Sequence, residues 1–151
     1  VNEVDFIDND FILNKKHFEN IGFFDENIFL YYETMDLCKK ARLANKKIYV
    51  CNKIKFSHYG SQSVSSNFSH KIALSRSWHY NWSKFYYFKK HFGYFFALRK
   101  VLPNFIRSLK RLLISKIYNK KIEYSLHKAE LSGILASVLN KPSDYRPFEI
   151  E

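Results

Sequence analysis

Hydrophobic and polar positions change their spacing twice along the first part of the chain. Apolar residues alternate with polar ones over residues 3–13 and again in "KIYVC", and this pattern predicts two strands. Between them, "NKKHFENIG" predicts a short helix with Asn14 as its N-cap and Gly22 as its stop. From Glu33, apolar residues recur at helical spacing as far as Asn45, so a second helix is predicted there. "IKFSHYG" predicts a further extended piece that leads into a Ser-rich loop.

The pattern becomes helical after Asn67. One helical stripe, ended by Gly93, contains Leu74, Trp78, Trp82, Phe85 and Phe92. A second, basic helix is predicted over residues 95–118 with a bend at Pro103, and a third over residues 121–139. The apolar side of the second helix contains Leu98, Leu102, Phe105, Leu109, Leu112 and Leu113. Such a stripe either packs in a core or lies on a membrane surface, and the pattern leaves both open.

Charge is distributed unevenly. The formal net charge is +11, yet no Asp or Glu occurs between Asp36 and Glu123. This asymmetry favours an anionic partner such as nucleotide phosphates, acidic lipid or nucleic acid, the alternative being a solvated surface with a Lys-rich composition. The two cysteines form neither a disulfide framework nor a metal-type pair, and a reducing compartment fits them. No signal peptide and no uncharged apolar run of about 18 residues is present, so we expect nothing to cross a bilayer.

Two carboxylates and a histidine are the candidate chemical groups. Glu33 and Asp36 lie three residues apart at a predicted helix start, so both face one side at the positive end of the helix dipole. Each acid alone is ordinary for a first helical turn, and a lone His58 after a strand is ordinary for a surface. Their order is more informative: an aromatic loop, an acidic helix start, a strand, and then a histidine before a Ser-rich loop.

That order carries a resemblance. "NKKHFENIGFFDENIFLYYETMDLCKKARLANKKIYVCNKIKFSHYGSQS" resembles the C-terminal half of the catalytic domain of family 2 glycosyltransferases, particularly bacterial rhamnosyltransferase-like members. Their pattern is "GGFDE-x-x-FxYYED-x-DLCLRxxxxG", a strand, and then "HxGG(S)". The resemblance implies an α/β fold of the GT-A type for residues 1–66, followed by a mainly helical, basic, amphipathic extension over residues 67–151. It also implies a nucleotide-sugar donor, a divalent metal (Mg or Mn) and, in most members, inversion at the anomeric carbon.

The resemblance also implies roles for individual residues. The acidic pair would supply the general base that deprotonates an acceptor hydroxyl, and His58 would reach the metal or the diphosphate. Phe24, Asp25 and Glu26 match the segment that lines the acceptor pocket. The family has Glu-Asp where this chain has Glu33 followed by Thr34. Threonine cannot act as a base, so either Glu33 or Asp36 must do so.

We therefore expect part of a glycosyltransferase that transfers a sugar from a nucleotide-sugar donor to a glycan or lipid-linked acceptor. The donor-binding half and its Asp-x-Asp motif are not in this sequence, so we expect the chain alone to be inactive. The expected location is cytoplasmic, with peripheral contact to the inner face of the cell membrane. The alternative is a non-enzymatic basic module that binds a membrane surface or nucleic acid. Exposed aromatics among Lys and Arg would favour that module. We expect no binding to nucleic acid, because the tryptophans share one apolar stripe.

Overall fold

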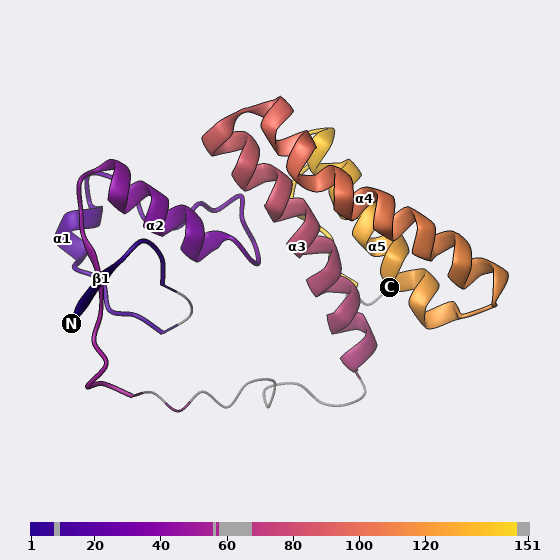
Figure 1. The fold of residues 1–151 in the computed structure, drawn as a ribbon, viewed down its shortest axis with the longest axis horizontal. Helices are drawn as coiled ribbons and strands as arrows, with labels where there is room; N and C mark the ends of the chain where they lie inside the picture. The colour runs from indigo at the N-terminus through magenta and orange to yellow at the C-terminus, as the bar shows by residue number, and fades with distance from the viewer. Residues whose placement is uncertain (8–9, 56, 58–67, 148–151) are drawn as a thin grey trace.

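The computed structural model describes residues 1–7, 10–55, 57 and 68–147. Within them the chain forms a small N-terminal unit and three long helices (Figure 1). The N-terminal unit contains β1 (Asn2–Val4), α1 (Lys15–Phe18), α2 (Glu33–Leu43) and β2 (Ile48–Val50). The long helices are α3 (Ser69–Phe92), α4 (Tyr94–Ile117) and α5 (Lys121–Val138).

The predicted α/β fold of the GT-A type is wrong for the described residues. They contain one two-stranded antiparallel sheet, in which Val4 pairs with Ile48, beside five helices. Only Glu3 and Val4 of the strand predicted over residues 3–13 lie in β1, and residues 5–7 and 10–13 are not in a strand. Alternation describes one segment, whereas a strand persists only where another strand satisfies its backbone groups.

Local signals gave the helices correctly. The Asn14 side chain accepts a hydrogen bond from the Lys16 backbone N–H, as an N-cap does. Gly93 follows the last residue of α3 with φ of 90°, a left-handed value that glycine adopts readily. The second helix of the three was predicted over residues 95–118, and α4 covers Tyr94–Ile117 without interruption at Pro103.

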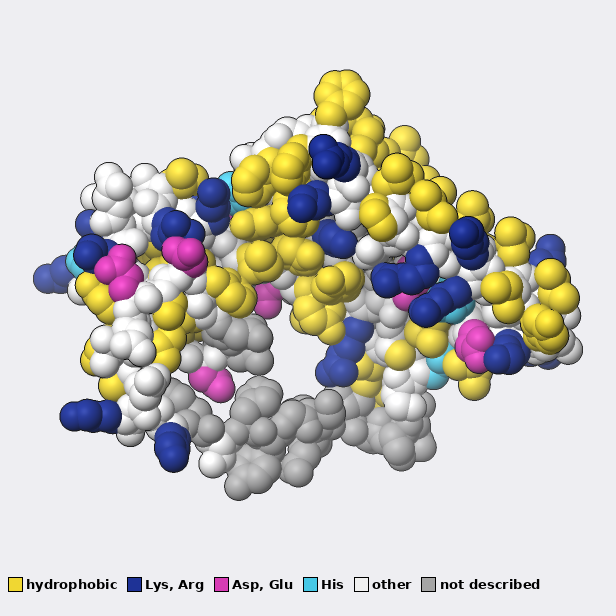
Figure 2. Space-filling model, viewed as in Figure 1, with side chains coloured by type: hydrophobic (Ala, Val, Ile, Leu, Met, Phe, Trp, Pro, Cys, Tyr) yellow, Lys and Arg dark blue, Asp and Glu magenta, His cyan; other side chains and the backbone are white. Residues whose placement is uncertain are grey.

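The core of the long helices consists of large side chains from α3 enclosed by α4 and α5. Trp78, Trp82 and Phe85 are each 3% exposed or less. At Gly133 of α5 a Cβ atom would lie only 2.3 Å from the Trp78 carbonyl oxygen, so the two backbones meet there. In Figure 2, hydrophobic side chains follow the outer edge formed by α4, and Lys and Arg side chains lie beside them.

Candidate functional site

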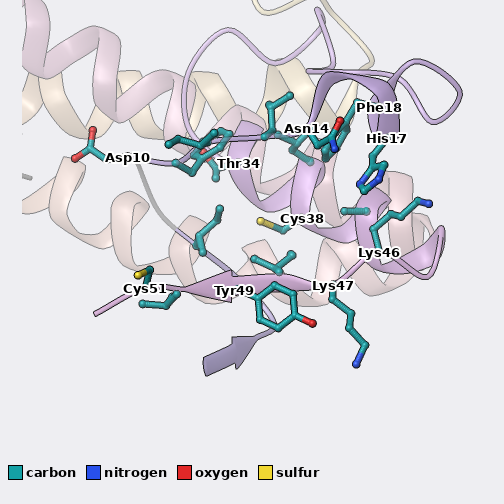
Figure 3. Close-up of a pocket in the computed structure, with 18 of the residues that line it drawn as sticks. Asp10, Asn14, His17, Phe18, Thr34, Cys38, Lys46, Lys47, Tyr49 and Cys51 are labelled. Carbon is teal, nitrogen blue, oxygen red and sulfur yellow. The ribbon is translucent and has the colours of Figure 1, made fainter. Parts of the chain in front are cut away.

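Helix α2 separates two different environments. On one side, Leu37, Cys38 and Ala41 line a cavity of about 490 Å³ that residues 10–14 and 46–51 help to enclose (Figure 3). On the other side, Asp36 reaches the end of α3. Burial raises the pKa of the Cys38 thiol, so this cysteine is a protonated packing residue. Neither of the predicted catalytic residues, Glu33 and Asp36, lines this cavity. Asp36 instead contacts α3 on the other side of the helix.

Asp36 is completely buried, and two side chains from the end of α3 hold its carboxylate. His91 Nε2 and Lys90 Nζ each lie 2.7 Å from Asp36 Oδ1. Lys40, one turn along α2, places its Nζ 3.6 Å from Oδ2. An ionised carboxylate is stable in a buried site only with such partners, so this arrangement fixes α2 to α3.

Asp25 joins the same group of charges from the loop before α2. Lys90 Nζ lies 2.7 Å from Asp25 Oδ2, and the Tyr86 hydroxyl donates to that oxygen at 3.0 Å. Although burial opposes ionisation, hydrogen bonds from Lys90 and Asn27 lower the pKa of Asp25 to about 2. Lys90 thus bridges two residues singled out by the sequence, and we call Asp25, Asp36, Tyr86, Lys90 and His91 the Lys90 cluster.

Glu33 differs from Asp36, although the two lie on the same helix. Its Oε2 is buried and, like Asp36 Oδ2, has no hydrogen-bond partner among the described residues, but Asp36 Oδ2 has Lys40 Nζ 3.6 Å away. The residues before it are unusual, because Tyr31 and Tyr32 both have left-handed backbones, with φ of 65° and 68°. That region is costly for a tyrosine and persists only where packing enforces it.

Contacts between aromatic rings hold Tyr31 and Tyr32 in this backbone conformation. The Tyr31 and Tyr32 rings lie 5.6 and 5.8 Å from the Tyr80 ring of α3, and Tyr32 also lies 5.4 Å from Tyr87. Burial, followed by the neighbouring Tyr80, raises the pKa of Tyr32, so its hydroxyl keeps its proton. The turn that presents Glu33 is therefore held in place by aromatic contacts.

Phe24 and Glu26, two other predicted site residues, do not belong to the Lys90 cluster. Phe24 is exposed and packs loosely on Phe11, with ring centroids 6.3 Å apart, and Glu26 is exposed. His58 lies outside the described residues, so its approach to Glu33 stays a prediction.

The described residues do not fit the divalent metal that the resemblance implies. No group of three or more His, Cys, Asp or Glu side chains among them could hold an ion. The carboxylates of Asp25 and Asp36 both contact Lys90 Nζ, so a cationic side chain already lies between them. We derive no chemical step through a metal here.

Sequence reasoning did not find Tyr86, Lys90 and His91, which complete the cluster. The only signal was indirect: because no acid occurs between Asp36 and Glu123, any basic residue of the central block that forms an ion pair must do so with an acid from one end of the sequence. Periodicity does not say which ones, since Asp36 and His91 are 55 positions apart.

Comparisons with protein-family models, with curated proteins and with solved structures find no match to this chain.

Proposed function

We propose that the segment around α2 is the acceptor side of a sugar-transfer site in which Glu33 is the general base. The proposal concerns the chemistry of this segment and does not need an α/β sheet in the described residues. Two things support it: the ordered resemblance of residues 14–63 to family 2 glycosyltransferases, and the different environments of the two candidate carboxylates. The single observation that carries it is the contrast between the Asp36 carboxylate, which Lys90 and His91 hold, and Glu33 Oε2, which has no hydrogen-bond partner among the described residues.

The base needs a lone pair that is free to take a proton. Asp36 uses its Oδ1 to accept from both Lys90 and His91, so protonating it would disrupt two charge-assisted contacts. Glu33 Oε2 and Asp36 Oδ2 both lack a hydrogen-bond donor among the described residues, but the Asp36 carboxylate is already held by Lys90 and His91 and has Lys40 Nζ 3.6 Å from Oδ2, so Glu33 is the better acceptor. Asp36 then becomes a positioning residue that holds α2 against α3.

In the proposed reaction the acceptor hydroxyl attacks the anomeric carbon of a nucleotide-activated sugar. The new C–O bond forms as the bond to the nucleoside diphosphate breaks, and that leaving group takes the electron pair. The hydroxyl proton passes to Glu33. Single displacement of this kind inverts the anomeric carbon, in agreement with the expectation from the resemblance.

The burial of Trp78 and Trp82 supports this function over nucleic-acid binding. Both indoles are 3% exposed and belong to the helical core, so neither is open to stack on bases.

The test compares Glu33→Gln with the unchanged sequence in the natural gene product that contains these residues. Transfer from radiolabelled nucleotide sugars to lipid and glycan acceptors is measured, together with thermal unfolding. We expect kcat to fall roughly 100-fold or more while the donor KM and the unfolding temperature change little, because only a proton acceptor is lost. Glu19→Gln, at an exposed position after α1, is the matched control. Unchanged kcat in Glu33→Gln would remove the base role from this residue.

A further inference from the structure

Helix α4 fully buries only small side chains, with Leu98 and Phe105 packed partly against the core, and it turns a line of large apolar side chains outward. The residues that face α3 and α5 are at most 2% exposed, namely Ala97, Val101, Ser108 and Ser115. The outward residues are 40% to 85% exposed, namely Phe95, Leu102, Ile106, Leu109, Leu113 and Ile117. Their spacing of seven, four, three, four and four places them on one line along the helix. We call this line the α4 stripe.

The α4 stripe is long and continuous with an aromatic tip. At about 1.5 Å per residue it extends about 33 Å. At its beginning, where α3 turns into α4, Phe92, Tyr94 and Phe96 add rings that are 39% to 46% exposed. Exposed apolar surface of this extent, on one side of a helix, indicates a contact surface.

The charged side chains of α4 itself are all positive. Helix α4 contains no acid, and its basic residues are Arg99, Lys100, Arg107, Lys110, Arg111 and Lys116. A hollow on this helix is lined by Leu102, Pro103 and Ile106 together with Arg107, Lys110 and Arg111. Apolar side chains and three cations thus meet in one depression, as they would around a lipid with an anionic headgroup.

We propose that the α4 stripe lies on an anionic membrane surface, with its apolar side chains among the acyl chains and its cations at the headgroups. Amphipathic helices with large apolar and basic faces bind membranes in this way. No described helix is long and apolar enough to span a bilayer, which agrees with a helix that lies flat. The inference is independent of the sugar-transfer proposal, because it uses no residue of α2 or of the Lys90 cluster.

Two other occupants fit less well. A second copy of this chain would bring two acid-free basic helices together, and their like charges would repel. Nucleic acid would suit the cations, but the α4 stripe consists mostly of Leu and Ile, which neither stack on bases nor hydrogen-bond with them.

The test is sedimentation of the protein with vesicles of phosphatidylcholine alone and with vesicles of equal parts phosphatidylcholine and phosphatidylglycerol. We expect binding to the anionic vesicles at low salt, and its loss at about 1 M NaCl, where charges are screened beyond about 3 Å. Replacing Arg107, Lys110 and Arg111 by Gln should weaken partitioning about fivefold for each charge removed.

A pair of triple variants separates the α4 stripe from general exposed hydrophobicity. Leu102→Ser, Ile106→Ser and Leu113→Ser together should lower partitioning at least about tenfold. The matched control replaces three equally exposed leucines of other helices or their ends, Leu43, Leu135 and Leu139, and should bind like the unchanged protein. Phe95→Trp adds a depth probe: brominated lipid should quench the new indole but not Trp78 and Trp82 in the core.

Several results would overturn the proposal. These are equal binding to neutral vesicles, no binding to anionic vesicles at low salt, and equal loss in both triple variants. A dimer in sedimentation velocity that the α4 stripe variant abolishes, without vesicle binding, would assign the surface to self-association. Tight duplex binding that the Leu and Ile changes leave intact, again without vesicle binding, would assign it to nucleic acid.

Discussion

At the scale of single residues, neighbouring carboxylates on α2 differ in what surrounds them. Asp36 has Lys90 and His91 on its Oδ1 and Lys40 3.6 Å from its Oδ2, whereas Glu33 Oε2 has no hydrogen-bond donor among the described residues, a lack that it shares with Asp36 Oδ2. The first arrangement is a structural ion pair, and the second leaves a group free for chemistry. The two roles can be separated by measuring stability and transfer on the same variants.

Asp36→Asn should destabilise the fold strongly. The change removes the buried negative charge and leaves Lys90 and His91 beside a neutral amide, and breaking a buried pair in this way costs roughly 3 kcal/mol. Denaturant titration measures the loss. Asp5→Asn is the control, because its pair with Arg42 is exposed and should contribute no more than about 1 kcal/mol. If both variants unfold at the same denaturant concentration, the Lys90 cluster does not hold α2 to α3.

At the scale of elements, the long helices depend on a close approach that only glycine allows. A Cβ at Gly133 would stand 2.3 Å from the carbonyl oxygen of Trp78, a backbone atom that cannot rotate away. Gly133→Ala should therefore push α5 from α3 and cost about 1–3 kcal/mol, despite the better helix propensity of alanine. Thermal unfolding measures this cost. Lys128→Ala, exposed on the same helix, should leave the melting temperature nearly unchanged, and an equally stable Gly133→Ala would show that α3 and α5 are not so close.

The helices and strands also show which parts of the fold could be predicted from the sequence. The Asn14 cap, the start of α2 at Glu33 and the end of α3 at Gly93 depend on nearby residues, and the sequence predicted them. The prediction of an α/β sheet was wrong because the residues that pair in a sheet lie far apart in the chain, where local patterns carry no information about them. Periodicity also predicted an amphipathic α4 but grouped Leu98 with Leu102, whereas the structure half-buries Leu98 and exposes Leu102. The inward face is set by small residues that allow close packing, which a search for large apolar residues overlooks.

At the scale of the whole molecule, distant segments meet around His79 of α3. This side chain is fully buried, with Nδ1 2.9 Å from Ser143 Oγ and Nε2 3.0 Å from the Tyr145 carbonyl oxygen. Arg146 Nη1 lies 3.2 Å from the same Nε2, so hydrogen-bonding groups of the C-terminal segment surround the imidazole. The Phe29 ring, from the loop before α2, lies 4.8 Å from the imidazole, and the Arg146 guanidinium covers that ring at 3.7 Å. His79 thus joins the N-terminal unit, α3 and the C-terminal segment.

This junction makes the stability of the protein depend on pH. Burial, together with the charge of Arg146, lowers the pKa of His79 below its ordinary value of 6.5, with hydrogen bonding to Tyr145 and the charge of Asp144 acting in the opposite direction. The unfolded chain therefore binds a proton more readily than the folded one, and the free energy of unfolding should fall as the pH drops below about 6.5.

His79→Gln keeps a donor and an acceptor but cannot titrate, so its unfolding free energy should fall less between pH 7.5 and 5.5. Urea titrations at several pH values measure both slopes, with the exposed His17→Gln as the control. Equal slopes for the unchanged protein and His79→Gln would mean that this histidine is not held neutral, and that another group sets the response to acid.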